Sequence, residues 1–182
     1  MAQKTLRILP TRFSDPVSQV IRCLTVFPYT HASIGLEEEG GRFYSFLFQG
    51  FVTEEAARPG RRGPACALYE VPVTEEAYGA AKATLADMTC HREEYHYDPL
   101  GLVLSFLHIP HRFRKRFFCS QFVAYVLGKS RAVPLGKSDS LYFPRDLSWL
   151  PGARLVYQGR LGDVPQSAWQ RPAAKQRERR VA

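Results

Sequence analysis

The chain has few sulfur-containing residues and no long hydrophobic run. Its 182 residues include only 4 cysteines, at positions 23, 66, 90 and 119, and these form no Cys-x-x-Cys pair. That spacing gives no disulfide framework, so we expect free thiols in a reducing compartment. No segment is long and apolar enough to cross a bilayer. The start of the chain, Met1 to Ile8, lacks the apolar run of a secretory signal, so we expect a cytoplasmic protein.

Acidic residues are also scarce, with 17 Asp and Glu against 25 Lys and Arg and a formal net charge of +8. The last residues, 171–182, carry half of this excess, because five cations there face one anion, which gives 5 − 1 = +4. We expect 169–182 to be a disordered basic tail that makes at most weak contact with an anionic surface. No zinc-finger or aromatic RNA-binding motif accompanies it, so no specific nucleic-acid partner is expected.

What is present in quantity is apolar and aromatic side chains, at 45% and 13% of the residues. Such a chain can bury a hydrophobic core without disulfides or a structural metal ion. Residues 1–168 are expected to form one domain. Alternation, capping residues and turn residues predict a mixed order of elements. The expected strands are 4–9, 29–36, 42–48, 65–73 and 153–160. The expected helices are 15–27, 74–90, 98–107 and 119–128, with a turn or short helix at 143–147.

This order predicts an α+β fold with a mostly antiparallel sheet packed against helices. The strands 29–36 and 42–48 should form a β-hairpin across the turn at 37–41. The segment 53–64 is rich in Arg, Gly and Pro and shows no periodicity, so it is predicted to be an exposed loop.

Cys119 stands at the predicted start of a helix, after the cationic run 112–116. Unpaired backbone N–H groups and the positive end of the helix dipole stabilise a thiolate at such a position. A cysteine nucleophile works as its thiolate, so this location suits nucleophilic catalysis. The alternative is a structural role, because Cys119 heads an apolar stripe that is typical of a buried helix face. The stripe consists of residues 119, 122, 123, 126 and 127.

His31 lies on a predicted strand whose alternate residues share one face with it, among them Tyr29. If the hairpin register sum is 76 or 78, Ser45 lies directly opposite His31 or diagonal to it. A hydroxyl there would help to fix the tautomer of the imidazole, although more weakly than a carboxylate. A half-buried strand histidine satisfied by backbone or water is the alternative.

Cys90, His91 and His96 form the one other Cys/His group in the sequence. Zinc sites normally take four ligands, and this group closes a helix and enters a charged loop. We therefore expect neither a metal nor another cofactor.

Three segments together resemble a known family: His31 to Leu36, Phe43 to Phe46, and Cys119 to Val123. They resemble the circularly permuted branch of the NlpC-type papain-like cysteine hydrolases, which includes bacterial YiiX-like proteins and lecithin:retinol acyltransferase-like enzymes. In that branch the histidine strand precedes the cysteine helix, as it does here. The resemblance implies a permuted papain-like fold and a bacterial thiol hydrolase.

The resemblance also implies roles for individual residues. Cys119 would be the nucleophile, His31 the general base, and Ser45 would occupy the third polar position. The backbone N–H of Cys119 would help to bind an oxyanion, with Tyr29, Ser120 and Gln121 as further oxyanion or substrate candidates. The implied reaction is cleavage of a peptide or amide bond through an acyl-thioester.

Three alternatives stay open at this point. A lipid acyl hydrolase or acyltransferase has the same fold, and fold alone does not select the substrate. The serine at the third position would also suit an inactive binding domain. A binder of anionic polymers or membrane surfaces led by the tail would lose binding when 171–182 are removed.

Overall fold

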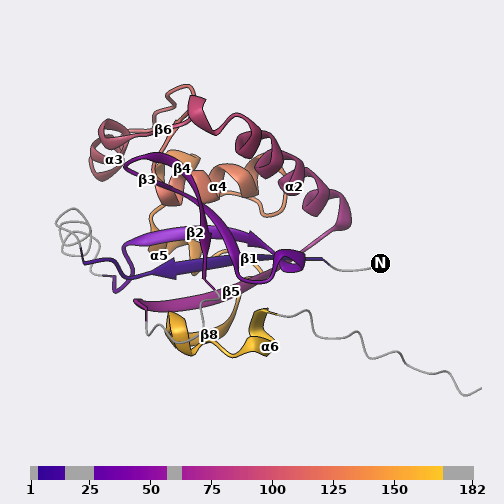
Figure 1. Ribbon diagram of the computed structural model, residues 1–182. Coiled ribbons are helices and arrows are strands. Elements are labelled where there is room, and N and C mark those ends of the chain that lie inside the picture. The colour runs from indigo at the N-terminus through magenta and orange to yellow at the C-terminus, as the bar shows by residue number, and fades with distance from the viewer. Residues whose placement is uncertain (1–3, 15–26, 57–62, 170–182) are drawn as a thin grey trace, which may run out of the picture.

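Figure 1 shows the computed structural model, which describes residues 4–14, 27–56 and 63–169. Its centre is a six-stranded sheet in the order β4-β3-β2-β1-β5-β8, and every pair of neighbours is antiparallel. The strands are β1 (Lys4–Thr11), β2 (His31–Leu36), β3 (Arg42–Leu47), β4 (Gly50–Glu55), β5 (Ala65–Val73) and β8 (Arg154–Arg160). Two short segments, β6 (His96–Tyr97) and β7 (Arg116–Phe117), pair in parallel away from this sheet.

Except for α6, which was not predicted, the α-helices in the described ranges follow the signals in the sequence. They are α2 (Glu75–Cys90), α3 (Pro99–Phe106), α4 (Cys119–Lys129), α5 (Pro144–Leu147) and α6 (Gln166–Trp169). The Thr74 hydroxyl accepts a hydrogen bond from the Ala77 N–H and so caps α2, while the Asp98 carboxylate does the same for Gly101 of α3. The predicted α+β class with a mostly antiparallel sheet is therefore confirmed.

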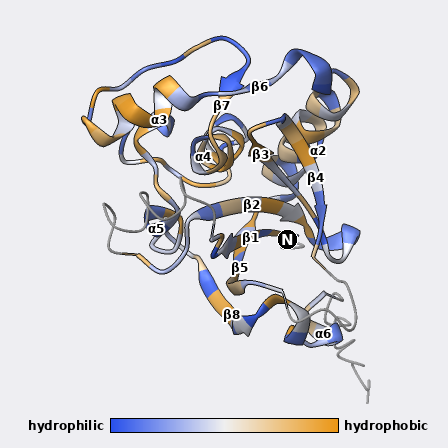
Figure 2. Cartoon of the chain, turned by 60° about the vertical axis from the view of Figure 1, so that its left-hand side comes forward, coloured by the Kyte–Doolittle hydropathy of each residue, from blue (hydrophilic) through white to orange (hydrophobic). Residues whose placement is uncertain are grey.

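The two faces of the sheet bury different sets of side chains. One face packs against α2 and α4, where Ile8, Ile34 and Phe46 meet Phe122 and other apolar residues of the largest core cluster. Figures 1 and 2 show α2, α3 and α4 on this side, with β8 and α6 at the other end of the molecule. The opposite face carries a smaller cluster that includes Phe43 and Trp169. Alternation along each strand thus sends neighbouring residues into two different layers.

The main error of the sequence prediction is β4, because residues 53–64 were expected to be a loop. Leu47 pairs with Gly50 across a two-residue turn, and Gly50 adopts a φ of 101°, which favours glycine. The chain reverses there and runs back along β3 to Glu55. The short strands β6 and β7 were not predicted either.

Some predictions concern parts of the chain outside the described residues. These are the helix at 15–27, together with Cys23, and nearly all of the basic tail at 169–182. Within the described ranges, none of the helices has the length and apolar character needed to cross a membrane.

Candidate functional site

Cys119 is the first residue of α4, and only Phe118 separates it from β7. Phe118 precedes it in an extended conformation, with φ −98° and ψ 166°, and its N–H donates to the Gln121 side-chain oxygen at 3.4 Å. The Phe122 N–H donates to the Phe118 carbonyl and closes the first turn. Cys119 is 7% exposed, so its thiol sits at the positive end of the helix in a mostly buried position.

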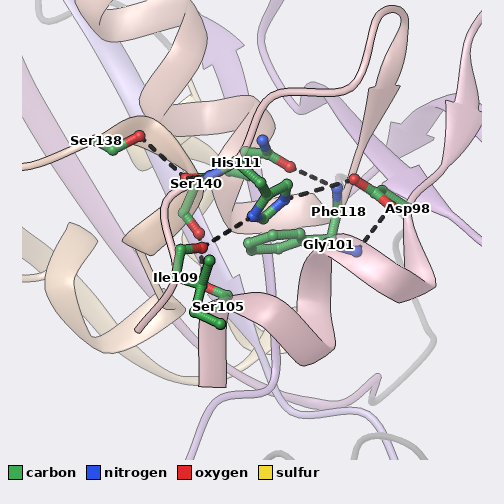
Figure 3. A network of polar contacts seen from close by, with 9 residues as sticks. Asp98, Gly101, Ser105, Ile109, His111, Phe118, Ser138 and Ser140 are labelled. Atoms are coloured by element: carbon green, nitrogen blue, oxygen red, sulfur yellow. Dashed lines mark hydrogen bonds and ion pairs between the residues drawn. The ribbon is translucent and has the colours of Figure 1, made fainter. Parts of the chain in front are cut away.

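A buried polar network braces the segment before Cys119 (Figure 3). The Asp98 N–H donates to the Phe117 carbonyl at 3.1 Å, and the Asp98 carboxylate accepts from the Gly101 N–H at 2.8 Å. The His111 Nε2 lies 3.6 Å from the second oxygen of Asp98. Phe118 packs against α3 and lies beside the His111 ring. The start of α4 is therefore fixed from the side of α3.

His31 begins β2 and pairs with Thr11 of β1. The Phe13 ring stacks on its imidazole, with ring centroids 4.6 Å apart and planes 17° apart, and His31 is only 3% exposed. The Cys119 side chain, 88 positions further along the chain, acts on this imidazole, and the interaction raises the pKa of His31. The structure thus brings together the two residues that the sequence selected as nucleophile and base.

The other partner of His31 is Glu54 on β4. Its carboxylate Oε1 lies 3.0 Å from the His31 Nε2, and its Oε2 accepts a hydrogen bond from the Ser33 hydroxyl at 2.8 Å. Because Nε2 faces Glu54, Nδ1 is the ring nitrogen that remains for the sulfur of Cys119. The carboxylate fixes the orientation of the ring, and Ser33 fixes the carboxylate.

Charge and burial shift the pKa values of His31 and Glu54 in opposite directions. Burial alone would lower the pKa of His31, but the Glu54 carboxylate and the hydrogen bonds to Cys119 and Glu54 raise it to about 10. Burial likewise tends to raise the pKa of Glu54, yet the nearby imidazole and the Ser33 hydroxyl lower it. The arrangement therefore favours a protonated imidazole beside the Glu54 carboxylate.

Ser45 does not contact the imidazole, contrary to our expectation. The register pairs Ile34 with Tyr44, so the sum is 78, as one of the two predicted registers required, and Ser45 lies diagonal to His31. Its hydroxyl instead donates to the Ala32 carbonyl at 2.6 Å in a fully buried position. Glu54, not Ser45, is the polar partner of His31.

The three oxyanion or substrate candidates have different surroundings. The Tyr29 hydroxyl donates to the Cys66 carbonyl at 3.3 Å and accepts from the Gln158 side chain at 3.1 Å. These two bonds hold the Tyr29 hydroxyl against β5 and β8. Gln121 uses its side-chain oxygen to cap α4. Ser120 follows Cys119 on the helix and is 1% exposed.

Glu54 was missed because its strand was missed. Phe51, Val52 and Thr53 are strand-forming residues directly after Gly50, and together with that glycine they could have indicated a third antiparallel strand. On such a strand Glu54 pairs with Phe43, two residues from Ser45 on the same face. Because Arg, Gly and Pro residues follow this short strand pattern, the segment 53–64 was predicted to be a loop.

The other described thiols lie in different surroundings. Cys66 is fully buried, and burial raises the pKa of its thiol to about 12. Cys90 is exposed at the end of α2, and the ring of its neighbour His91 contacts Asp87. In the ranges that the structure describes, no three His, Cys, Asp or Glu side chains are grouped so as to hold a metal ion.

A pocket of about 660 Å³ opens beside the carboxylate of Glu54. Phe13, which covers the His31 ring, forms part of its wall, and Thr11 contributes a hydroxyl. Apolar side chains complete the lining, among them Leu9, Ala56 and Leu161. The pocket is therefore mostly apolar, and Glu54 is one of the few polar residues that line it.

Neither a scan against protein-family models nor a search of curated proteins finds a match to this chain.

Proposed function

We propose that this protein is a thiol hydrolase of the permuted papain-like type, which cleaves a peptide or amide bond through an acyl-thioester. The observation that carries the proposal is the chain of contacts from Cys119 to His31 to Glu54. A nucleophile at a helix N-terminus, a base in contact with it, and a third group that orients the base are the parts that such catalysis needs. A buried structural cysteine would require neither of the other two residues.

The reaction follows from these contacts. The imidazolium of His31 holds the proton that the thiol gives up, and the sulfur of Cys119 forms a bond to the substrate carbonyl carbon. The N–H of Cys119 at the start of α4 donates to the oxyanion. The carbon–nitrogen bond then breaks as the imidazolium returns its proton to the leaving amine. Water, deprotonated by His31, attacks the thioester and releases the acid and the thiol.

Glu54 is the orienting residue in this mechanism. Its carboxylate holds His31 in the tautomer that presents the other ring nitrogen to the sulfur, and it stabilises the imidazolium that forms. A serine at this place was the reason to consider an inactive binding domain. With a carboxylate as the partner of His31, that reason no longer applies.

A lipid acyl hydrolase or acyltransferase is the second candidate function. It is favoured by exposed apolar side chains on α3, the helix that packs against Phe118 next to the nucleophile. Amide substrates and phospholipids distinguish the two candidates, since each predicts turnover of only its own class.

The experiment compares turnover by the protein and its Cys119→Ala, His31→Ala and Cys90→Ala variants. The substrates are a mixture of peptides, in which cleavage creates new amino termini, and phospholipids, in which it releases fatty acid. We expect peptide cleavage that is lost in C119A, is reduced at least about a hundredfold in H31A, and is unchanged in C90A. Cleavage that persists in C119A would refute the proposal, and fatty acid release alone would favour the second candidate.

A further inference from the structure

Helix α3 presents a row of aliphatic side chains to solvent. Leu100, Val103 and Leu107 recur at helical spacing and are 58%, 55% and 64% exposed, and Ile109 beyond the helix is 47% exposed. The opposite side of α3 is the one that packs, through Leu102, on Phe118. We call Leu100, Val103, Leu107 and Ile109 the α3 patch. Figure 2 shows α3 as a mainly hydrophobic element at the outside of the molecule.

Two aromatic side chains extend the apolar character around the α3 patch. The Phe48 ring is 63% exposed and packs on Tyr97, just before α3, with centroids 4.8 Å apart. Trp149 is 79% exposed and lines a pocket of about 790 Å³ together with Phe106 and His108 from the end of α3. Single exposed apolar residues are ordinary, but a contiguous set marks a surface that binds something apolar.

Positive charge accompanies this apolar surface. Residues 99–138 contain seven Lys and Arg and no Asp or Glu. The acids at either end of this segment, Asp98 and Asp139, are 1% and 6% exposed, and each faces a basic side chain. Arg114 and Arg116 are exposed, and within the described ranges neither has an acidic partner at ion-pair distance. The side chains of Arg114 and Arg116 therefore remain available to an anionic partner.

We propose that the α3 patch, together with Arg114 and Arg116 of the segment that follows α3, docks on the surface of an anionic lipid bilayer. Aliphatic side chains that enter the acyl boundary, with Lys and Arg at headgroup level, are the two components of interfacial binding. An exposed tryptophan at the rim suits the same depth. A nucleic acid would match the cations but would gain nothing from four aliphatic side chains.

This proposal does not rest on the thiol chemistry, so C119A should bind as the unaltered protein does. It also differs from binding by the tail, because the docking residues lie on α3 and the loop that follows. Docking through α3 would bring the region of Phe118, and hence the start of α4, close to the bilayer.

The test is sedimentation of the full chain with vesicles of phosphatidylcholine alone or with phosphatidylglycerol. We expect binding to the anionic vesicles that L100S/V103S/L107S weakens about a hundredfold, because three aliphatic side chains no longer enter the lipid. The matched control is L155S/V156S, which removes two exposed aliphatic side chains of β8, at the far end of the molecule from α3 in Figure 1. Unchanged binding by the triple variant would overturn the proposal.

A second pair of variants tests the charges without touching the apolar side chains. R114E/R116E should weaken binding at least about tenfold, whereas R154E/R160E, with the same change of net charge on β8, should leave it almost unaltered. If both pairs of substitutions weaken vesicle binding equally, the effect depends only on net charge, and binding through a defined surface is contradicted. The proposal would also be contradicted if binding were lost only when residues 171–182 are removed. It would likewise be contradicted if the protein bound a soluble polyanion equally well and the α3 substitutions did not change that binding.

Discussion

The replacement Glu54→Gln tests the electrostatic role of the carboxylate that faces His31. Glutamine keeps the size of the side chain but removes the charge 3.0 Å from the His31 Nε2. For two unit charges at that separation and an effective dielectric constant of about 20, the attraction is about 5 kcal/mol. Since one pKa unit corresponds to about 1.4 kcal/mol, this loss would lower the pKa of His31 from about 10 to below its ordinary 6.5, in the direction that burial favours.

Alkylation of Cys119 by iodoacetamide, followed by peptide mass spectrometry, measures the consequence. In the unaltered protein His31 should stay protonated beside the sulfur between pH 6 and pH 8, so the rate should change little over this range. In E54Q the rate at pH 7.5 should fall about tenfold, because the imidazole is then mostly neutral and no longer stabilises the thiolate. Cys90 is an exposed reference thiol within the same sample.

The matched control is Glu55→Gln, since Glu55 is the next residue on β4 and pairs with the exposed Arg42 at 3.1 Å. Its alkylation profile should match that of the unaltered protein. If E54Q and E55Q both retain the original profile, the carboxylate of Glu54 does not control the charge of His31, and the reasoning is refuted.

Three further predictions concern stability. Ser45→Ala removes one buried hydrogen bond and should cost about 1 kcal/mol in urea unfolding, while alkylation at Cys119 should proceed at its original rate. A slower rate would show that this hydroxyl acts on the imidazole after all. Gly101→Ala would place a methyl group against the Asp98 carboxylate and the His111 ring, so it should lower the free energy of unfolding by about 2 kcal/mol or more. A neutral effect in thermal unfolding would contradict this packing. Protonated His31 should stabilise the fold fully below pH 6.5 and lose this contribution as pH rises through about 10. The unfolding free energies of the protein and His31→Gln should therefore converge at high pH.

Local patterns in the sequence predicted the elements that carry the nucleophile and the base. The apolar stripe and the following Gly128 marked α4, and alternation marked the strand of His31. That these elements meet could not be read from periodicity, because it depends on packing between segments 88 positions apart. The pairing of Cys119 with His31 came from the order of motifs in a resembling family.

The third residue could not be predicted for two physical reasons. The face and the diagonal position of Ser45 were predicted. Its side chain is short, however, and its hydroxyl donates to the nearby Ala32 carbonyl. Glu54 has a longer side chain and approaches His31 from one strand further away. Only the turn at Gly50 brings that strand back along β3, and a single glycine is a weak signal.

The measurement that tests the central claim most directly is a search for an acyl group on Cys119 during turnover of an activated ester such as p-nitrophenyl acetate. Rapid quenching and peptide mapping should find the acetyl group on Cys119 and not on Cys66, and deacylation should be slower in His31→Ala. Acetylation spread over the exposed Cys90 and lysines, with Cys119 unmodified, would contradict the account.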